Sequence, residues 1–280
     1  MSELNLKVIE GLEMEGRLNT SDEDVLANIQ ASIRRGHPQI KRQELQNDRI
    51  CLVGSGPSLA HTETELVRLL HEGAKLVTVN GGYHWCLARN LKPSAQVVID
   101  ARAGNERFVE PDAPGCVYML ASQCHPKVFD AVEGRSAVWI FHTMNEGNPT
   151  KDLLDEFYLG QWDGVPGGTT VATRAMVVLR MLGYLRFDLF GIDSCVMEGV
   201  HHAVPQPENA HDKFYPLKVG PTSHPEISRT FTVTGWHCKQ FEDMLQFIRV
   251  NGDFVLVNVH GDGLIAYALR VGADLAITEE

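Results

Sequence analysis

Residues 50–59 read Ile-Cys-Leu-Val-Gly-Ser-Gly-Pro-Ser-Leu, and this stretch decides the fold. Its first four residues form a continuous apolar run, which is typical of a strand buried on both faces of a parallel sheet. The run ends at Gly54, Ser55 and Gly56, where the backbone can turn tightly and approach a ligand. Pro57 suits the first position of a helix, because that position needs no amide hydrogen. The stretch therefore predicts a strand, a tight turn and a helix.

The same alternation of strand and helix continues along the chain. Further strands are expected at 75–79, 96–99, 117–120, 138–141, 186–190 and 254–259, and further helices at 169–182, at 235–250 and from residue 264. Continuous apolar strands separated by helices indicate a parallel sheet that is covered on both sides. We therefore predict an α/β fold with a mostly parallel sheet and helices on both faces.

The two remaining stretches differ in character from this core. Residues 1–47 are polar, but Ser21 begins a capping-box pattern, and Val25, Ile29 and Ile33 recur at helical spacing. They predict an N-terminal helical extension in front of a main domain at 48–280. Residues 192–230 show little periodicity and predict a long loop, which in a compact domain is more often functional than idle.

Composition excludes several classes of function. The 280 residues include 25 Lys plus Arg and 36 Asp plus Glu, so the formal charge is −11, which disfavours a general nucleic-acid binder. No apolar run approaches the ~20 residues that a membrane-spanning helix needs. The six cysteines form no C-x-x-C pair, and the N-terminus has no apolar leader, so we expect a reducing, cytoplasmic compartment. The oligomeric state stays open.

The glycine turn is the first candidate site. The free amides of Ser58 and Leu59, at the start of the helix, would face an anion such as a phosphate. The spacing matches neither the G-x-G-x-x-G dinucleotide motif nor a Walker A loop. The second strand ends at Asn80, where an NAD site usually has an acidic residue, so a mononucleotide is favoured. The alternative is a purely structural turn.

A second anion site is expected where another helix begins. Gly167, Gly168 and Thr169 precede the helix at 169–182, and their glycines and hydroxyls suit a helix N-terminus that binds an anion. Ordinary helix capping is the alternative interpretation.

Two aspartates follow buried strands and form the third candidate. Asp100 and Asp193 would reach the same edge of the sheet, where two carboxylates can hold Mg²⁺ together with substrate phosphates. Either residue could instead cap a helix.

Histidines and aromatic residues complete the candidates. His201, His202 and His211 lie beside Asp212, and a loop histidine can act as a general base, whereas the spacing differs from that of common zinc sites. The rings that could stack on a base or a pterin are Tyr83, Trp85 and Trp236, unless they belong to the core. A serine nucleophile is disfavoured, because the G-x-S-x-G elbow is absent.

These motifs together resemble a known family. Their order is Val-Gly-Ser-Gly-Pro-Ser-Leu (53–59), a strand leading to Asn80, a strand ending at Asp100, Gly-Gly-Thr-Thr-Val (167–171), Leu-Phe-Gly-Ile-Asp (189–193) and His-Ala (202–203). Over about residues 48–205, the chain resembles the 6-hydroxymethylpterin pyrophosphokinase MptE-like family. The resemblance implies a Rossmann-like fold, and archaeal members transfer diphosphate from ATP, with Mg²⁺, to a hydroxymethyl-dihydropterin. It extends to flagellin glycosyltransferases and to bacterial sialyltransferases that use CMP-sugars.

The resemblance also implies roles for individual residues. Nucleotide contacts fall on Gly54, Ser55, Gly56, Ser58 and Asn80. Metal binding or acceptor orientation falls on Asp100 and Asp193, and the base or acceptor contact falls on His202. Three functions are therefore expected: diphosphate transfer from ATP, glycosyl transfer from a CMP-sugar to an unidentified hydroxyl acceptor, or a non-catalytic accessory role.

Overall fold

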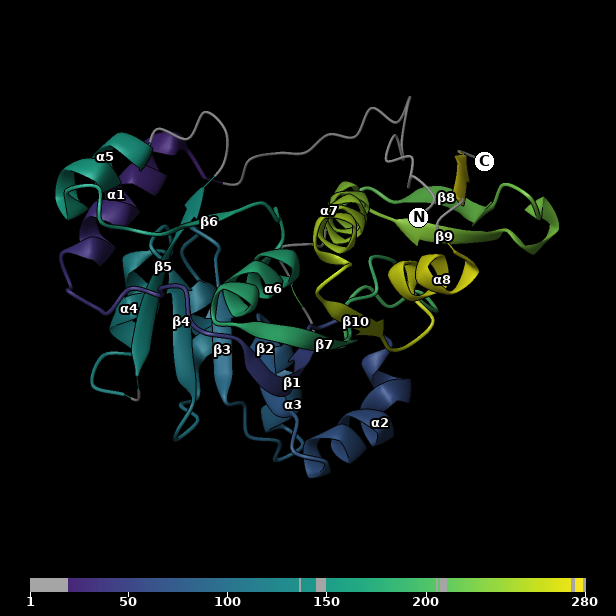
Figure 1. Cartoon of the computed structure of the whole chain (residues 1–280), viewed down its shortest axis with the longest axis horizontal. Coiled ribbons are helices and arrows are strands. Elements are labelled where there is room, and N and C mark those ends of the chain that lie inside the picture. The colour runs from purple at the N-terminus through teal and green to yellow at the C-terminus, as the bar shows by residue number, and fades with distance from the viewer. Residues whose placement is uncertain are drawn as a thin grey trace.

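An eight-stranded parallel sheet forms the centre of the molecule (Figure 1). The computed structural model describes residues 20–135, 137–144, 150–204, 206, 211–272 and 275–278. The strands, in spatial order, are β10 (Leu256–Val259), β7 (Tyr184–Phe190), β1 (Gln46–Val53), β2 (Lys75–Val79), β3 (Ala95–Val98), β4 (Val117–Ala121), β5 (Val138–Met144) and β6 (Gly164–Pro166). Every neighbouring pair in this sheet is parallel. The predicted α/β, Rossmann-like fold is confirmed.

Strand β1 lies in the middle of the sheet and has helices on both of its faces. Cys51 and Val53 pack with α2 on one face, whereas Ile50 and Leu52 belong to the larger core on the other face. This alternation follows from the two-residue period of a strand. The strand order reverses between β1 and β7, so the carboxyl ends of these strands form the crevice where open α/β sheets bind ligands.

Eight α-helices within the described residues surround the two sheets. They are α1 (Asp22–Ile33), α2 (Leu59–His71), α3 (Gly82–Leu87), α4 (Pro126–Ala131), α5 (Thr150–Tyr158), α6 (Val171–Met181), α7 (Gly235–Asn251) and α8 (Leu264–Val271). In Figure 1, α6 and α7 lie on the side of the sheet opposite α2. No helix in the described part of the chain is long and apolar enough to cross a membrane. All six cysteines are buried and unbridged, as expected for reduced core thiols.

The N-terminal helix α1 packs directly on the main domain. Its apolar face adds Ile29 and Ile33 to the large core. Asn28 donates hydrogen bonds of 3.0 and 3.1 Å to the carbonyls of Ala101 and Gln123, just beyond β3 and β4. The helix thus shares its core with the sheet and helps to order the sheet edge where the candidate site lies.

The stretch expected to be a long loop contains a β-hairpin, so this prediction was wrong for part of residues 192–230. The second sheet consists of β8 (Tyr215–Pro221), β9 (Arg229–Val233) and β11 (Leu275–Thr278), paired antiparallel. Prolines and a glycine within β8 hide the strand pattern in the sequence. Leu217 and Phe231 nevertheless face the core. Irregular chain therefore remains mainly between β7 and β8, beside the crevice.

Candidate functional site

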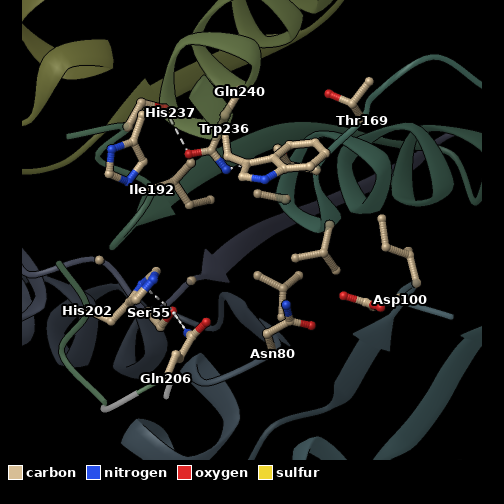
Figure 2. A pocket seen from close by; sticks show the side chains of 18 of the residues that line it. Ser55, Asn80, Asp100, Thr169, Ile192, His202, Gln206, Trp236, His237 and Gln240 are labelled. Carbon is tan, nitrogen blue, oxygen red and sulfur yellow. Dashed lines mark hydrogen bonds between the residues drawn. The ribbon is translucent and has the colours of Figure 1, made fainter. Parts of the chain in front are cut away.

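A cavity of about 470 Å³ lies at the carboxyl ends of β1, β2, β3 and β7 (Figure 2). The turn after β1, the start of α6, the segment after β7 and the start of α7 contribute to its wall. The predicted site residues that line the cavity are Gly54, Ser55, Gly56, Asn80, Asp100, Thr169, Asp193 and His202. Pro57, Ser58, Gly167 and Gly168 are not among its lining residues. The structure therefore brings most of the candidates from five distant segments to one cavity.

The amides of the glycine turn are already hydrogen-bonded within the protein. The Gly54 amide donates to the Phe190 carbonyl, and the Gly56 amide donates to the Gly191 carbonyl, each at a distance of 2.8 Å. The Ser58 amide donates to Asp193 Oδ2 over 2.9 Å, and Leu59 donates to the Gly56 carbonyl over 3.3 Å. The expectation that the Ser58 and Leu59 amides would face an anion is therefore not met, because a carboxylate and a carbonyl accept their protons.

Asp193 accepts from the amide of Ser58, the N-cap residue of α2, so it lies at a helix end, as the capping alternative for this residue expected. Its side chain is buried, and this burial raises the pKa of its carboxyl. Two glycines make room for it: a Cβ on Gly56 would lie 2.7 Å from the Gly191 carbonyl oxygen, and a Cβ on Gly263 would lie 2.7 Å from Asp193 Cα. Asp193 thus ties the turn after β1 to the turn before α8.

Asp100 is paired with a cation that the sequence analysis did not single out. Arg102 donates to its carboxylate from Nε over 2.9 Å, from Nη2 over 2.5 Å and from the backbone amide over 2.9 Å. Among the described residues that line the cavity, Arg102 is the lone lysine or arginine. Its position two residues beyond Asp100 was the signal in the sequence, because it places Arg102 at the same sheet edge as Asp100.

The carboxylates do not form a metal-binding set. Asp100 accepts from Arg102, and Asp193 accepts from the Ser58 amide. Within the described part of the chain, no three His, Cys, Asp or Glu side chains are grouped so that they could hold a metal ion. Each of the two carboxylates expected to hold Mg²⁺ therefore has a hydrogen-bond partner within the protein.

The N-terminus of α6 differs from that of α2. Thr170 is its N-cap residue in extended conformation, but no side chain caps the helix, and its first turn contains no acidic residue. Thr169 is fixed by Asp243, whose Oδ2 accepts from the Thr169 amide and hydroxyl over 2.5 Å each. Thr170, Val171 and Ala172 line the cavity, so the positive end of the α6 dipole adjoins this space.

The two glycines before α6 shape its approach. Gly167 and Gly168 have φ values of +64° and +71°, in the left-handed region that favours glycine. A Cβ on Gly168 would lie 2.7 Å from the Arg174 amide nitrogen. These residues thus set the chain path into α6, outside the cavity lining.

Three histidines form a connected group on the cavity wall. His237 Nδ1 accepts the Thr234 amide over 3.2 Å, so a neutral His237 must carry its proton on Nε2. That proton points to His201 Nε2, 3.1 Å away, which leaves the His201 proton on Nδ1. Burial, followed by the fields of His201 and His202, lowers the pKa of His237 to about 3. One hydrogen bond thus joins the Nε2 atoms of His201 and His237, which disfavours metal binding by either atom.

His202 stacks on His201 and faces the glycine turn. The ring centroids are 4.0 Å apart, with 24° between the planes. His202 Nδ1 lies 3.4 Å from Ser55 Oγ, and this hydroxyl accepts from Gln206 Nε2 over 2.8 Å (Figure 2). Burial, and then the neighbouring His201, lower the pKa of His202 to about 4. His202 is therefore a neutral imidazole at pH 7, and the ring nitrogen that carries no hydrogen can accept a proton.

The three aromatic candidates differ in how exposed their side chains are. Tyr83 and Trp85 are 0% and 4% exposed and belong to the core, whereas Trp236 is 40% exposed and lines the cavity. Asn80 also lines it, with a positive φ of 43° and a buried Oδ1 that has no hydrogen-bond partner in the described part of the chain. His211, the third histidine of the predicted cluster, is exposed and does not line the cavity.

Comparison with known proteins identifies a structural neighbour and the family of this chain. A solved structure titled as the MAf glycosyltransferase from Magnetospirillum magneticum AMB-1 superposes with a TM-score of 0.63 at 14% identity, over 89% of this chain and 38% of that one. No curated protein matches the chain in sequence. The 6-hydroxymethylpterin diphosphokinase MptE-like family model matches residues 23–199, and so includes α1, which the resemblance at 48–205 left out. The chain belongs to the 6-hydroxymethylpterin diphosphokinase MptE-like family.

Proposed function

We propose that this protein transfers a glycosyl group from a nucleotide sugar with a single phosphate, such as a CMP-sugar, to a hydroxyl acceptor. The family and the glycosyltransferase neighbour support a transferase-like role. The cavity at the reversal of strand order supports a nucleotide-sized ligand. The choice among donors rests on the charges around this cavity.

The charge balance of the cavity wall is the observation that carries the proposal. Asp100, Asp193 and Asp212 line the cavity with Arg102, and the lowered pKa values of the three histidines leave these rings neutral at pH 7. Two unit charges about 4 Å apart interact by about 4 kcal/mol near a protein surface. A triphosphate would add several negative charges to this surplus, whereas one phosphate is matched by Arg102 and the α6 N-terminus.

The geometry suggests a separate role for each group in the transfer reaction. The acceptor oxygen attacks the anomeric carbon, the bond from that carbon to the phosphate oxygen breaks, and the nucleotide leaves with the electron pair. His202 Nδ1 takes the acceptor proton, as a general base. Arg102 and the first-turn amides of α6 stabilise the charge that develops on the leaving phosphate. The bound anion also raises the pKa of His202 from its low value toward neutrality.

The family description favours a second candidate, which is diphosphate transfer from ATP to a hydroxymethyl-pterin. In that reaction the negative charge of the triphosphate must be neutralised, usually by Mg²⁺. The paired state of Asp100 and the capping role of Asp193 weigh against this candidate.

Thermal unfolding with added ligands tests the choice. A ligand at about 100 times its Kd stabilises the folded state by about 2.7 kcal/mol, which gives a readily measured rise in Tm. We expect CMP with EDTA to raise the Tm, and ATP with Mg²⁺ to do so much less. The reverse order would favour diphosphate transfer, and no rise with either ligand would favour a non-catalytic role.

The Arg102→Gln variant links that result to the site, since it should lose about half of the CMP effect. Arg89→Gln is the matched control, because Arg89 also pairs with a carboxylate, Glu63, but does not line the cavity. Equal loss in both variants would contradict the assigned phosphate contact.

A further inference from the structure

We propose that Trp236 is the stacking platform for the flat ring of the nucleotide base, and that the base therefore binds at the α7 side of the cavity. The inference deepens the proposed function, since it assigns the part of the cavity that receives the base. It commits to a planar heteroaromatic ring as the ligand.

Exposure distinguishes this side chain from the other aromatic candidates. Trp236 is 40% exposed, and its indole lines the cavity. The ring contacts found among the described residues include two in the same wall, His201 with His202 and His201 with His237, but none involves Trp236. A large ring face that is open to a cavity and has no aromatic neighbour is available for stacking.

The support beneath Trp236 is rigid. It is the second residue of α7, which begins with a capping box between Thr234 and His237. One turn later, Gln240 donates to Thr170 Oγ1 over 3.2 Å and accepts from Ser194 over 2.8 Å. These bonds hold the start of α7 against the start of α6 and the segment after β7, so the backbone that carries the indole is held in place before a ring stacks on it.

The surroundings suit an apolar ring that leads to a phosphate. Ile192 and Val171 line the cavity with Trp236 and offer apolar surface. In Figure 2 the indole extends toward Thr169, at the approach to α6, while Asn80 and Asp100 lie on the opposite side of the cavity. A base on Trp236 thus places its attached phosphate near the α6 N-terminus.

Binding of uncharged nucleosides tests this subsite without depending on a phosphate or on turnover. Cytidine, uridine and adenosine should quench the fluorescence of the wild-type protein, and the quenching should be absent in Trp236→Phe, which keeps the other three tryptophans. Calorimetry should show that Trp236→Ala weakens CMP binding about 5- to 150-fold, whereas Trp236→Phe retains most of the affinity.

Phe157→Ala is the control, because Phe157 is an exposed aromatic on α5 that does not line the cavity. The proposal is overturned if Trp236→Ala binds CMP as the wild type does, or if methyl glycosides quench Trp236 and nucleosides do not. Circular dichroism of both variants excludes misfolding. Nucleoside binding without glycosyl transfer would contradict the proposed function alone, and transfer that survives Trp236→Ala unchanged would contradict this inference alone.

Discussion

The N-termini of α2 and α6 begin at the same edge of the sheet after glycine-containing turns, yet they differ in what faces their amides. At α2, Asp193 accepts from the Ser58 amide and occupies the helix end. At α6, Asp243 accepts from the Thr169 amide, one residue before the N-cap, whereas Thr170, Val171 and Ala172 line the cavity. A glycine turn before a helix therefore does not by itself make an anion site, because a carboxylate from elsewhere in the chain can fill it.

The largest expected effect comes from making α6 resemble α2. Thr170→Asp places a carboxylate at the uncapped helix end, where it competes with a phosphate and repels it. We expect CMP affinity to fall at least about 100-fold, while the free energy of unfolding stays the same or rises, because aspartate is a good N-cap residue. Calorimetric titration and urea unfolding measure the two quantities.

Thr170→Asn is the control for that experiment, since asparagine caps a helix without a charge. Its CMP affinity should fall much less than that of Thr170→Asp. Unchanged CMP binding in Thr170→Asp would show that the phosphate lies elsewhere.

The opposite change removes the cap from α2. Asp193→Ala leaves the buried Ser58 amide without its acceptor, so the free energy of unfolding should fall by about 1–3 kcal/mol. Asp193→Asn keeps an acceptor oxygen and should recover part of this loss. Urea unfolding at pH 7 measures both variants, and a fully stable Asp193→Ala would refute the capping role.

Replacing Arg102 should have a smaller effect on CMP affinity than Thr170→Asp. Arg102→Gln removes the guanidinium from the cavity wall and should weaken CMP binding about tenfold, with a reduced dependence on salt. Its effect on stability should be slight, because the pair with Asp100 is partly exposed. An unchanged Kd would separate Arg102 from the phosphate.

A last expected effect is on the pH dependence of stability. The pKa of His202 is lowered to about 4 in the folded protein, below its ordinary value of about 6.5. Between these values the unfolded chain binds more protons than the folded one, so stability is lost as pH falls from about 6.5 to about 4. His202→Gln should reduce this slope, by at most about 1.4 kcal/mol per pH unit. Identical slopes in denaturant titrations would contradict the neutral, buried state of His202.

The sequence predicted the sheet and the site's location better than the details of the site. Apolar runs such as residues 50–53 identify strands buried on both faces, and residues at strand ends must gather at one edge of a parallel sheet. That logic placed Asn80 and Asp100 at the edge where the cavity lies.

The group that bonds to the amides at each helix N-terminus could not be predicted in the same way. The bond between Ser58 and Asp193 spans 135 positions, so local sequence left open whether this turn binds an anion or is purely structural. The link between His201 and His237 likewise depends on the packing of α7 beside the segment after β7. Such long-range pairings arise from tertiary packing, which local periodicity does not encode.

A crystal structure with bound CMP tests the central claim most directly. The account predicts that the phosphate oxygens accept hydrogen bonds from the first-turn amides of α6 and from Arg102, with the Ser58 amide still bonded to Asp193. A phosphate seated on the turn at residues 54–58, with Asp193 displaced from α2, would contradict it.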